Sequence, residues 1–148
     1  MVEAKNRIVI DASAVVKWSS KKEIERALIL REKQVKGEKL LSAPDLLAYE
    51  VCNSLRYNPE FTEEDVKNAV KSLFELHLEL HPPTIENIDK VSDNAFKYNI
   101  TAYDAAYLSL AESERCPFIT ADERLYEKLE ESPLVVLLSS DKFYEITS

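Results

Sequence analysis

The stretch RIVIDASAVVK, residues 7–17, contains a short apolar run, then an aspartate, then the start of a predicted helix. Residues 8–10 are continuously apolar, which is typical of a strand buried on both faces of a sheet. Asp11 ends this run, and Ser13 follows at the position of a helix N-cap. Because ligands of open α/β sheets bind at the carboxyl ends of the strands, Asp11 lies where a site is expected. Taken alone, however, Asp11 is better explained as a cap of the helix.

The composition indicates one soluble globular domain over residues 1–148. Apolar residues make up 45% and charged residues 31% of the sequence, a balance that excludes a disordered chain. No apolar run has the length of a membrane span or forms a signal peptide, so we expect a cytoplasmic protein. Cys52 and Cys116 lack the spacing of metal ligands and are interpreted as buried free thiols.

The net charge of −8 is unfavourable for a protein that binds nucleic acid. This charge opposes broad electrostatic attraction to a phosphate backbone or to an anionic lipid surface. A nuclease with this composition therefore needs metal ions that neutralise part of its acidic charge.

Strands and helices are predicted to alternate along the chain. We expect strands at residues 8–10, 39–41, 77–81, 117–120 and 134–138. The helices between them include one over 22–36, which Gly37 ends, and two that begin at capping boxes in 42–45 and 62–65. This alternation predicts an α/β fold, a three-layer α/β/α sandwich with a central, mostly parallel five-stranded sheet.

His77 and His81 are four residues apart, which is the spacing of two zinc ligands on a helix. Leu78 and Leu80 alternate with the histidines and favour a strand, on which both histidines point outward. The strand is our interpretation, and a zinc site is the alternative.

Three further carboxylates can reach the sheet edge that Asp11 occupies. Asp122 also ends an apolar strand and begins a helix, so capping explains it when it is taken alone. Asp104 fits a capping box, although an acid on an apolar helix costs free energy without a partner. Glu50 falls in the third turn of its predicted helix, past any capping position.

Four carboxylates share a cleft only if cations lie between them, because their charges repel one another. Carboxylate oxygens select hard cations, so the expected metal is Mg²⁺ or Mn²⁺. Two such ions about 3.5–4 Å apart would activate a water and stabilise both oxygens of an in-line phosphoryl displacement. Helix N-termini beneath Asp11 and Asp122 would help to keep these acids ionised. Periodicity alone does not establish that the four acids converge.

Four segments resemble the signature segments of the PIN-domain nucleases. They are IVIDASAVVKW, APDLLAYEVCNSL, ITAYDAAYLSLAE and FITADERL, which occur in the family's order and cover nearly the whole chain. They are most similar to the toxin component of VapBC-type toxin–antitoxin pairs. The resemblance implies a metal-dependent endoribonuclease with an α/β/α sandwich, an RNA substrate, a small antitoxin protein as partner and, often, a homodimer.

The resemblance also assigns roles to particular residues. The residues that match the family's catalytic, metal-holding acids, here called the acidic quartet, are Asp11, Glu50, Asp104 and Asp122. Ser13 and Thr120 match hydroxyls beside the metal site, and Asn53 matches a polar position one turn after the glutamate.

Three basic residues near the proposed edge, Lys17, Arg56 and Arg124, are candidate phosphate ligands, although each could equally be solvated surface. Two other functions stay open at this point. One is a PIN-fold binding or scaffold module with a vestigial site, which the complete acidic quartet disfavours. The other is a DNA-directed nuclease, which the short chain disfavours because it lacks the extra helical elements and basic surface for gripping duplex DNA.

Overall fold

A computed structural model describes residues 6–19 and 25–148. Within these ranges the chain forms a five-stranded sheet in the order β3-β2-β1-β4-β5, with every neighbouring pair parallel. The strands are β1 (Arg7–Ile10), β2 (Leu40–Pro44), β3 (Glu79–His81), β4 (Phe118–Thr120) and β5 (Val135–Leu137). The predicted parallel sheet is confirmed, with β1 at its centre.

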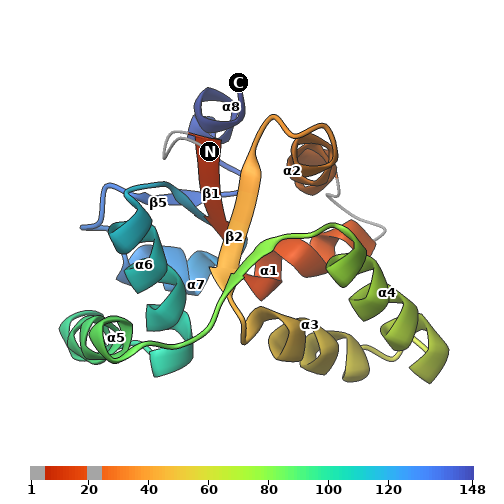
Figure 1. Cartoon of the computed structure of the whole chain (residues 1–148), viewed down its shortest axis with the longest axis horizontal. Helices are drawn as coiled ribbons and strands as arrows, with labels where there is room; N and C mark the ends of the chain where they lie inside the picture. The colour runs from red at the N-terminus through yellow and green to blue at the C-terminus, as the bar shows by residue number, and fades with distance from the viewer. Residues whose placement is uncertain (1–5, 20–24) are drawn as a thin grey trace.

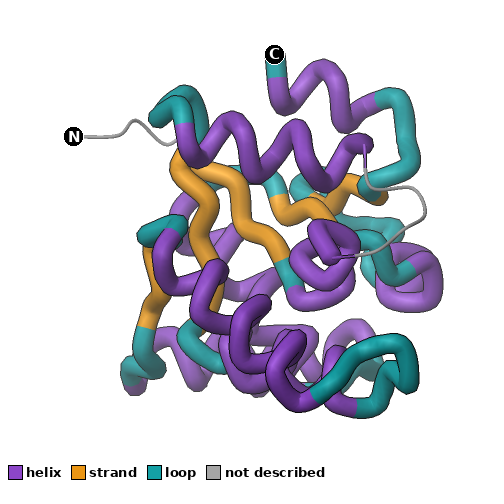
Figure 2. The backbone as a smooth tube through the Cα atoms, turned by 90° about the vertical axis from the view of Figure 1, so that its right-hand side faces the viewer, coloured by secondary structure: helices purple, strands orange, loops and turns teal. Residues whose placement is uncertain are grey.

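Helices cover both faces of the sheet, which confirms the predicted three-layer sandwich (Figure 1). One side carries α1 (Ala12–Val15), α2 (Glu25–Val35), α3 (Leu47–Arg56) and α4 (Glu63–Glu75), and a 3₁₀ helix, η2 (Val16–Ser19), continues α1. The other side carries α5 (Ile85–Tyr98) and α6 (Ala102–Glu114). The remaining helices, α7 (Glu123–Lys128) and α8 (Lys142–Thr147), pack against β5. Figure 2, seen from the side of α2 and α4, shows helices crossing in front of the strands.

The core lies where the two helix layers meet the central strands. Residues 8–10 of β1 and Phe118 and Ile119 of β4 are at most 1% exposed. α6 is buried from residue 105 to residue 111 and packs against β1, β2 and β4. Each large apolar side chain buried in this way contributes about 1.5–3 kcal/mol to folding. None of the described helices is both long and apolar enough to cross a membrane.

The helix start predicted at residues 42–45 is wrong. Ser42 lies inside β2, and α3 begins only at Leu47, without a side-chain cap. The strand is preferred because Ser42 is fully buried between β1 and β3, where its hydroxyl donates to Glu79 Oε1 at 3.3 Å. As a consequence, Glu50 lies in the first turn of α3 and not in the third.

Other helix boundaries agree with the sequence. The predicted capping box of α4 is confirmed, because the Thr62 hydroxyl accepts the Asp65 amide and the Asp65 carboxylate accepts the Thr62 amide. Gly37 follows α2 in the left-handed region, at a φ of +72°. The first residues of the helix predicted over 22–36 lie outside the described residues.

The N-cap of α1 and the burial of Cys52 differ from the predictions. Asp11, and not Ser13, is the N-cap of α1, since its side chain accepts the amide of Ala14. Cys52 was expected to be buried but is exposed, because it lies on the face of α3 that points away from the core. Cys116 is buried, as predicted.

Candidate active site

The carboxyl ends of β1 and β4 carry Asp11 and Asp122 to the same edge of the sheet. The two strands are parallel neighbours, and each acid follows the end of its strand. Each acid also caps a helix: Asp11 Oδ1 accepts the amide of Ala14 at 3.2 Å, and Asp122 Oδ1 accepts the amide of Leu125 at 3.1 Å. Capping and membership of a shared site are therefore compatible for both acids.

Two hydroxyls hold the carboxylate of Asp11. Ser13 Oγ donates to Oδ1 at 2.5 Å, and Thr120 Oγ1 donates to Oδ2 at 2.5 Å. The same hydroxyls accept backbone amides that follow β4, from Ala121 to Ser13 at 2.9 Å and from Asp122 to Thr120 at 3.1 Å. This network fixes the orientation of Asp11 and joins the end of β1 to the end of β4.

Burial raises the pKa of Asp11 to about 6. The residue is only 6% exposed, and removing a carboxylate from water disfavours its charged form. The hydrogen bonds from Ser13 and Thr120 act in the opposite direction, whereas the charge of Asp104 raises the pKa further. Asp11 and Asp104 are therefore close enough to interact, although they lie on different elements.

Glu50 on α3 is bonded to a residue of α6. Its Oε1 accepts a hydrogen bond from the hydroxyl of Tyr107 at 2.6 Å. Burial raises the pKa of Glu50, the bond from Tyr107 opposes this, and the charge of Asp104 adds to the increase. Glu50 thus also lies within electrostatic reach of Asp104.

Asp104 lies in the first turn of α6. The hydroxyl of Thr101 caps this helix by accepting the Asp104 amide at 3.0 Å, but the reciprocal bond of the predicted capping box is not formed. Burial raises the pKa of Asp104, and repulsion from Asp122 adds to this effect, while the charge of Lys128 lowers the pKa. The carboxylate of Asp104 therefore interacts with each of the other three acids.

Each of the other three acids is within electrostatic range of Asp104, but the acidic quartet does not form a tight ligand cluster. Among the described residues, only one set of three possible ligand groups has its atoms within 4.8 Å of one another, and it lies outside the quartet. The quartet is an open group of repelling carboxylates, three of which have raised pKa values. A cation between them would remove this repulsion, and an all-oxygen donor set fits Mg²⁺ or Mn²⁺.

A cavity of about 380 Å³ opens beside two of these acids. It is lined by Asp104 and Asp122 together with two cations, Arg124 and Lys128. Lys128 Nζ also donates to the carbonyl of Asn99 at 3.3 Å. Arg124, a predicted phosphate ligand, therefore shares a cavity with half of the acidic quartet, and Lys128 is a cation that the sequence analysis missed.

A PIN-domain family model matches residues 8–130, most of the chain. The chain belongs to the PIN-domain family. This PIN domain is similar to Ribonuclease VapC3 of Pyrobaculum aerophilum, at 32% identity over 82% of this chain and 94% of that protein. It is also similar to Ribonuclease VapC1 of Mycobacterium tuberculosis, at 33% identity over 79% of this chain and 86% of that protein.

A solved structure shares the fold of this PIN domain. It is the crystal structure of PAE2754 from Pyrobaculum aerophilum, with a TM-score of 0.70 at 20% identity. The match covers 97% of this chain and 91% of that one. The likeness is one of fold and extends over nearly all of the PIN domain.

Three other candidate residues of the PIN domain lie around different cavities. Asn53 and Arg56 line a cavity of about 680 Å³ between α3 and α4, where the guanidinium of Arg56 lies 4.8 Å from the ring centroid of Tyr57. Lys17 lines a third cavity, which it shares with Ala121 of the β4–α7 connection. None of the three lines the cavity of Asp104 and Asp122.

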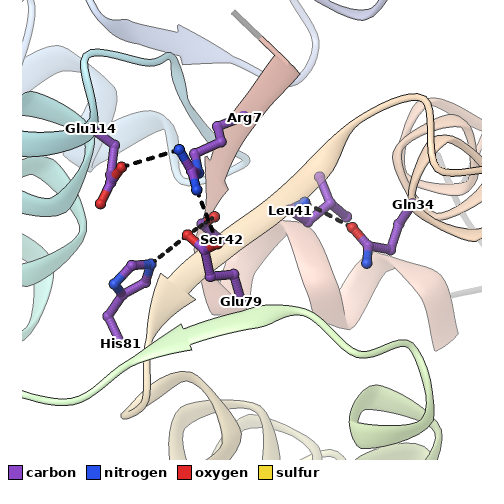
Figure 3. Close-up of polar contacts among 7 residues, drawn as sticks. All are labelled: Arg7, Gln34, Leu41, Ser42, Glu79, His81 and Glu114. Atoms are coloured by element: carbon purple, nitrogen blue, oxygen red, sulfur yellow. Dashed lines mark hydrogen bonds and ion pairs between the residues drawn. The ribbon is translucent and has the colours of Figure 1, made fainter. Parts of the chain in front are cut away.

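The two histidines of the PIN domain have different environments. His77 is exposed in a turn at a φ of 55°, because β3 begins only at Glu79 and is shorter than predicted. His81 Nε2 lies 2.8 Å from Glu79 Oε1 (Figure 3). Together with Glu114 these two residues form the compact set noted above, but Arg7 binds Glu79 at 3.2 Å and Glu114 at 3.5 Å. The guanidinium thus already supplies the positive charge between the two glutamates.

Tyr107 is a second residue near the site that the sequence analysis missed. It is 1% exposed, and its ring stacks on Phe118 at a centroid distance of 5.9 Å. Burial and the neighbouring Glu50 raise the pKa of Tyr107, so its hydroxyl stays protonated and acts as a donor. The available signal was its position three residues after Asp104, which places both side chains on one face of a helix.

Proposed function

We propose that this PIN domain is a metal-dependent endoribonuclease that hydrolyses RNA phosphodiester bonds at the acidic quartet. The observation that carries the proposal is that Asp104 and Asp122 line one cavity, while Asp104 also lies within electrostatic range of Asp11 and Glu50. The names of the relatives from Pyrobaculum aerophilum and Mycobacterium tuberculosis, both ribonucleases, support RNA as the substrate.

The four carboxylates would hold Mg²⁺ or Mn²⁺ in this proposal. When bound, the ions supply an activated water and stabilise the charge of an in-line displacement. Ser13 and Thr120 orient the carboxylate of Asp11 before any ion binds, since both hydroxyls donate to it. Such preorganisation lowers the cost of ordering ligands when the metal and substrate arrive.

The RNA backbone approaches this site in spite of the net charge of −8. Arg124 and Lys128 line the cavity that also holds Asp104 and Asp122, so cations lie next to the proposed point of cleavage. Phosphate contacts from such residues position a nucleic acid without reading its sequence. Lys17 lies beside the β4–α7 connection and would extend this basic path.

The biological role that we infer is that of the toxin in a toxin–antitoxin pair. The segments that resemble VapC-type proteins support this role, and so do the names of the relatives. A small antitoxin protein would be the partner, the PIN domain would form a homodimer, and both would act in the cytoplasm.

Cleavage of mixed RNA in EDTA, Mg²⁺ and Mn²⁺ tests the enzymatic proposal. We expect cleavage only with metal, and a loss of several orders of magnitude in rate for each amide replacement, because each removes a ligand charge from a cooperative site. The variants are Asp11→Asn, Glu50→Gln, Asp104→Asn and Asp122→Asn. Asp141→Asn makes the same charge change at the exposed start of α8 and should cleave at the wild-type rate.

The alternatives predict different results in the same assay. A scaffold with a vestigial site cleaves nothing in either metal, and a DNA-directed nuclease cleaves single-stranded or duplex DNA faster than RNA. If Asp104→Asn retained the wild-type rate, Asp104 would be a residue of the first helical turn with no role in catalysis.

A further inference from the structure

The bond between Tyr107 and Glu50 connects two helices that cover opposite faces of the sheet. Glu50 lies on α3 and Tyr107 on α6, and both helices reach past the carboxyl ends of β1 and β2 (Figure 1). The hydroxyl donates to Oε1 of Glu50 at 2.6 Å. The bond therefore fixes a side chain of the acidic quartet from across the proposed cleft.

Tyr107 is itself rigidly held. It is 1% exposed, and its ring stacks on Phe118 of β4, whose own side chain is fully buried. Its hydroxyl cannot move far from Glu50 without disturbing this packing, because side chains in a close-packed core have little free volume. The position of Oε1 is thus set by the core of the protein and not by solvent.

The two oxygens of Glu50 consequently have different surroundings. Oε1 accepts the bond from Tyr107, whereas Oε2 accepts no hydrogen bond from any residue in the described part of the chain. Asp104 lies close enough to raise the pKa of Glu50, so another acid of the quartet is within electrostatic range of this carboxylate.

We propose that Tyr107 is a positioning residue of the metal site: its hydroxyl holds Oε1 of Glu50 and leaves Oε2 as the oxygen that binds Mg²⁺ or Mn²⁺. This inference rests on the proposed function, since it requires a cation at the acidic quartet. Partners that orient a metal-binding side chain commonly contribute 10–100-fold to metal affinity.

A purely structural role for the same bond makes a different prediction. A buried tyrosine hydroxyl needs a partner, and Glu50 would then serve only to satisfy it. In that case, loss of the hydroxyl changes the stability of the metal-free protein but leaves its affinity for Mn²⁺ unchanged.

The experiment measures Mn²⁺ affinity from the electron paramagnetic resonance signal of the free ion. The proteins are the wild type, Tyr107→Phe, Glu50→Gln and the double variant. Tyr107→Phe keeps the stacked ring, so a melting curve in EDTA should show a folded protein. We expect its Mn²⁺ affinity to be about 10–100-fold lower than that of the wild type. Tyr103→Phe, on the same helix and 65% exposed, is the matched control and should bind Mn²⁺ as the wild type does.

The double variant tests whether Tyr107 acts through Glu50. If it does, removing the hydroxyl in the Glu50→Gln background should weaken Mn²⁺ binding no further. Excess Mn²⁺ should also restore RNA cleavage to Tyr107→Phe but not to Glu50→Gln. Glu50→Asp keeps the ligand charge but withdraws the carboxylate from the hydroxyl, so its affinity should fall to a similar extent.

Two results would overturn the inference while leaving the proposed function intact. One is wild-type Mn²⁺ affinity in Tyr107→Phe, and the other is an equal loss of affinity with and without the Glu50 carboxylate. Failure of the wild type to bind Mn²⁺ at all would instead refute the metal-dependent function, and the positioning role with it.

Discussion

Asp11 is a buried carboxylate, and the hydrogen bonds from the surrounding hydroxyls offset only part of the cost of burying its charged form. Its pKa of about 6 lies above the ordinary value of 3.8, so the folded protein binds a proton more tightly than the unfolded chain does. Without metal, the contribution of this group therefore favours folding at low pH and is lost as the pH rises from about 4 to about 6. A metal ion reverses this dependence, because it binds only the ionised form.

The affinity for Mn²⁺ should consequently fall as the pH is lowered through about 6. Asp11 is about nine-tenths ionised at one pH unit above its pKa and about one-tenth ionised at one unit below, so its contribution alone weakens binding about tenfold between pH 7 and pH 5. Titrations of the wild type with Mn²⁺ at both pH values measure this change. Equal dissociation constants would show that Asp11 need not lose a proton and is not a ligand.

The elements of the fold position the acids by different local devices. Asp11 and Asp122 follow strands and cap short helices, whereas Asp104 lies in the first turn of α6 and depends on where that helix begins. The hydroxyl of Thr101 sets this start by accepting the Asp104 amide. α4 begins in the same way at Thr62, and no member of the acidic quartet lies on this helix.

Thr101 and Thr62 cap their helices in the same way, so mutation of Thr62 is a matched control for mutation of Thr101. Thr101→Ala and Thr62→Ala should each lower the free energy of unfolding by about 1 kcal/mol, since each removes one N-cap hydrogen bond. Only Thr101→Ala should also weaken Mn²⁺ binding, because fraying of the first turn of α6 displaces Asp104. Chemical denaturation and Mn²⁺ titration of both variants check this expectation. A similar loss of metal affinity in Thr62→Ala would mean that the effect is one of global stability.

At the scale of the whole molecule, repulsion among the carboxylates of the acidic quartet lowers the stability of the metal-free fold. The charge of Asp122 helps to raise the pKa of Asp104, and the charge of Asp104 helps to raise the pKa values of Asp11 and Glu50. The parallel sheet holds these charges at one edge because its core contributes far more free energy than their repulsion removes.

Asp122→Asn should therefore leave the metal-free protein as stable as the wild type, or more stable, near neutral pH. The variant removes repulsion with Asp104, and asparagine can still cap α7 by accepting the Leu125 amide. Mn²⁺ at about 100 times its dissociation constant should stabilise the wild type by about 2.7 kcal/mol and the variant much less. Melting curves in EDTA and in Mn²⁺ measure both effects, with Asp141→Asn as the control of equal charge. An equal metal response in the wild type and Asp122→Asn would exclude Asp122 from the site.

Local patterns in the sequence determined the class of fold and two of the site's positions. Apolar runs ending in Asp11 and Asp122 predict strand ends, and parallel strands place their carboxyl ends at one edge. The capping box of α4 follows equally from residues 62–65 alone. Such features depend on neighbours within a few residues, so the chain reveals them without its tertiary structure.

Contacts between distant segments were decided only by the tertiary structure. The bond of Tyr107 to Glu50 spans 57 positions in the chain, and Arg7 meets Glu79 across 72. The strand order β3-β2-β1-β4-β5 and the packing of α6 on the sheet bring these partners together. The predicted start of α3 was wrong for the same reason. Ser42 has the local sequence pattern of a helix cap, but its burial in β2 between two neighbouring strands outweighs that preference.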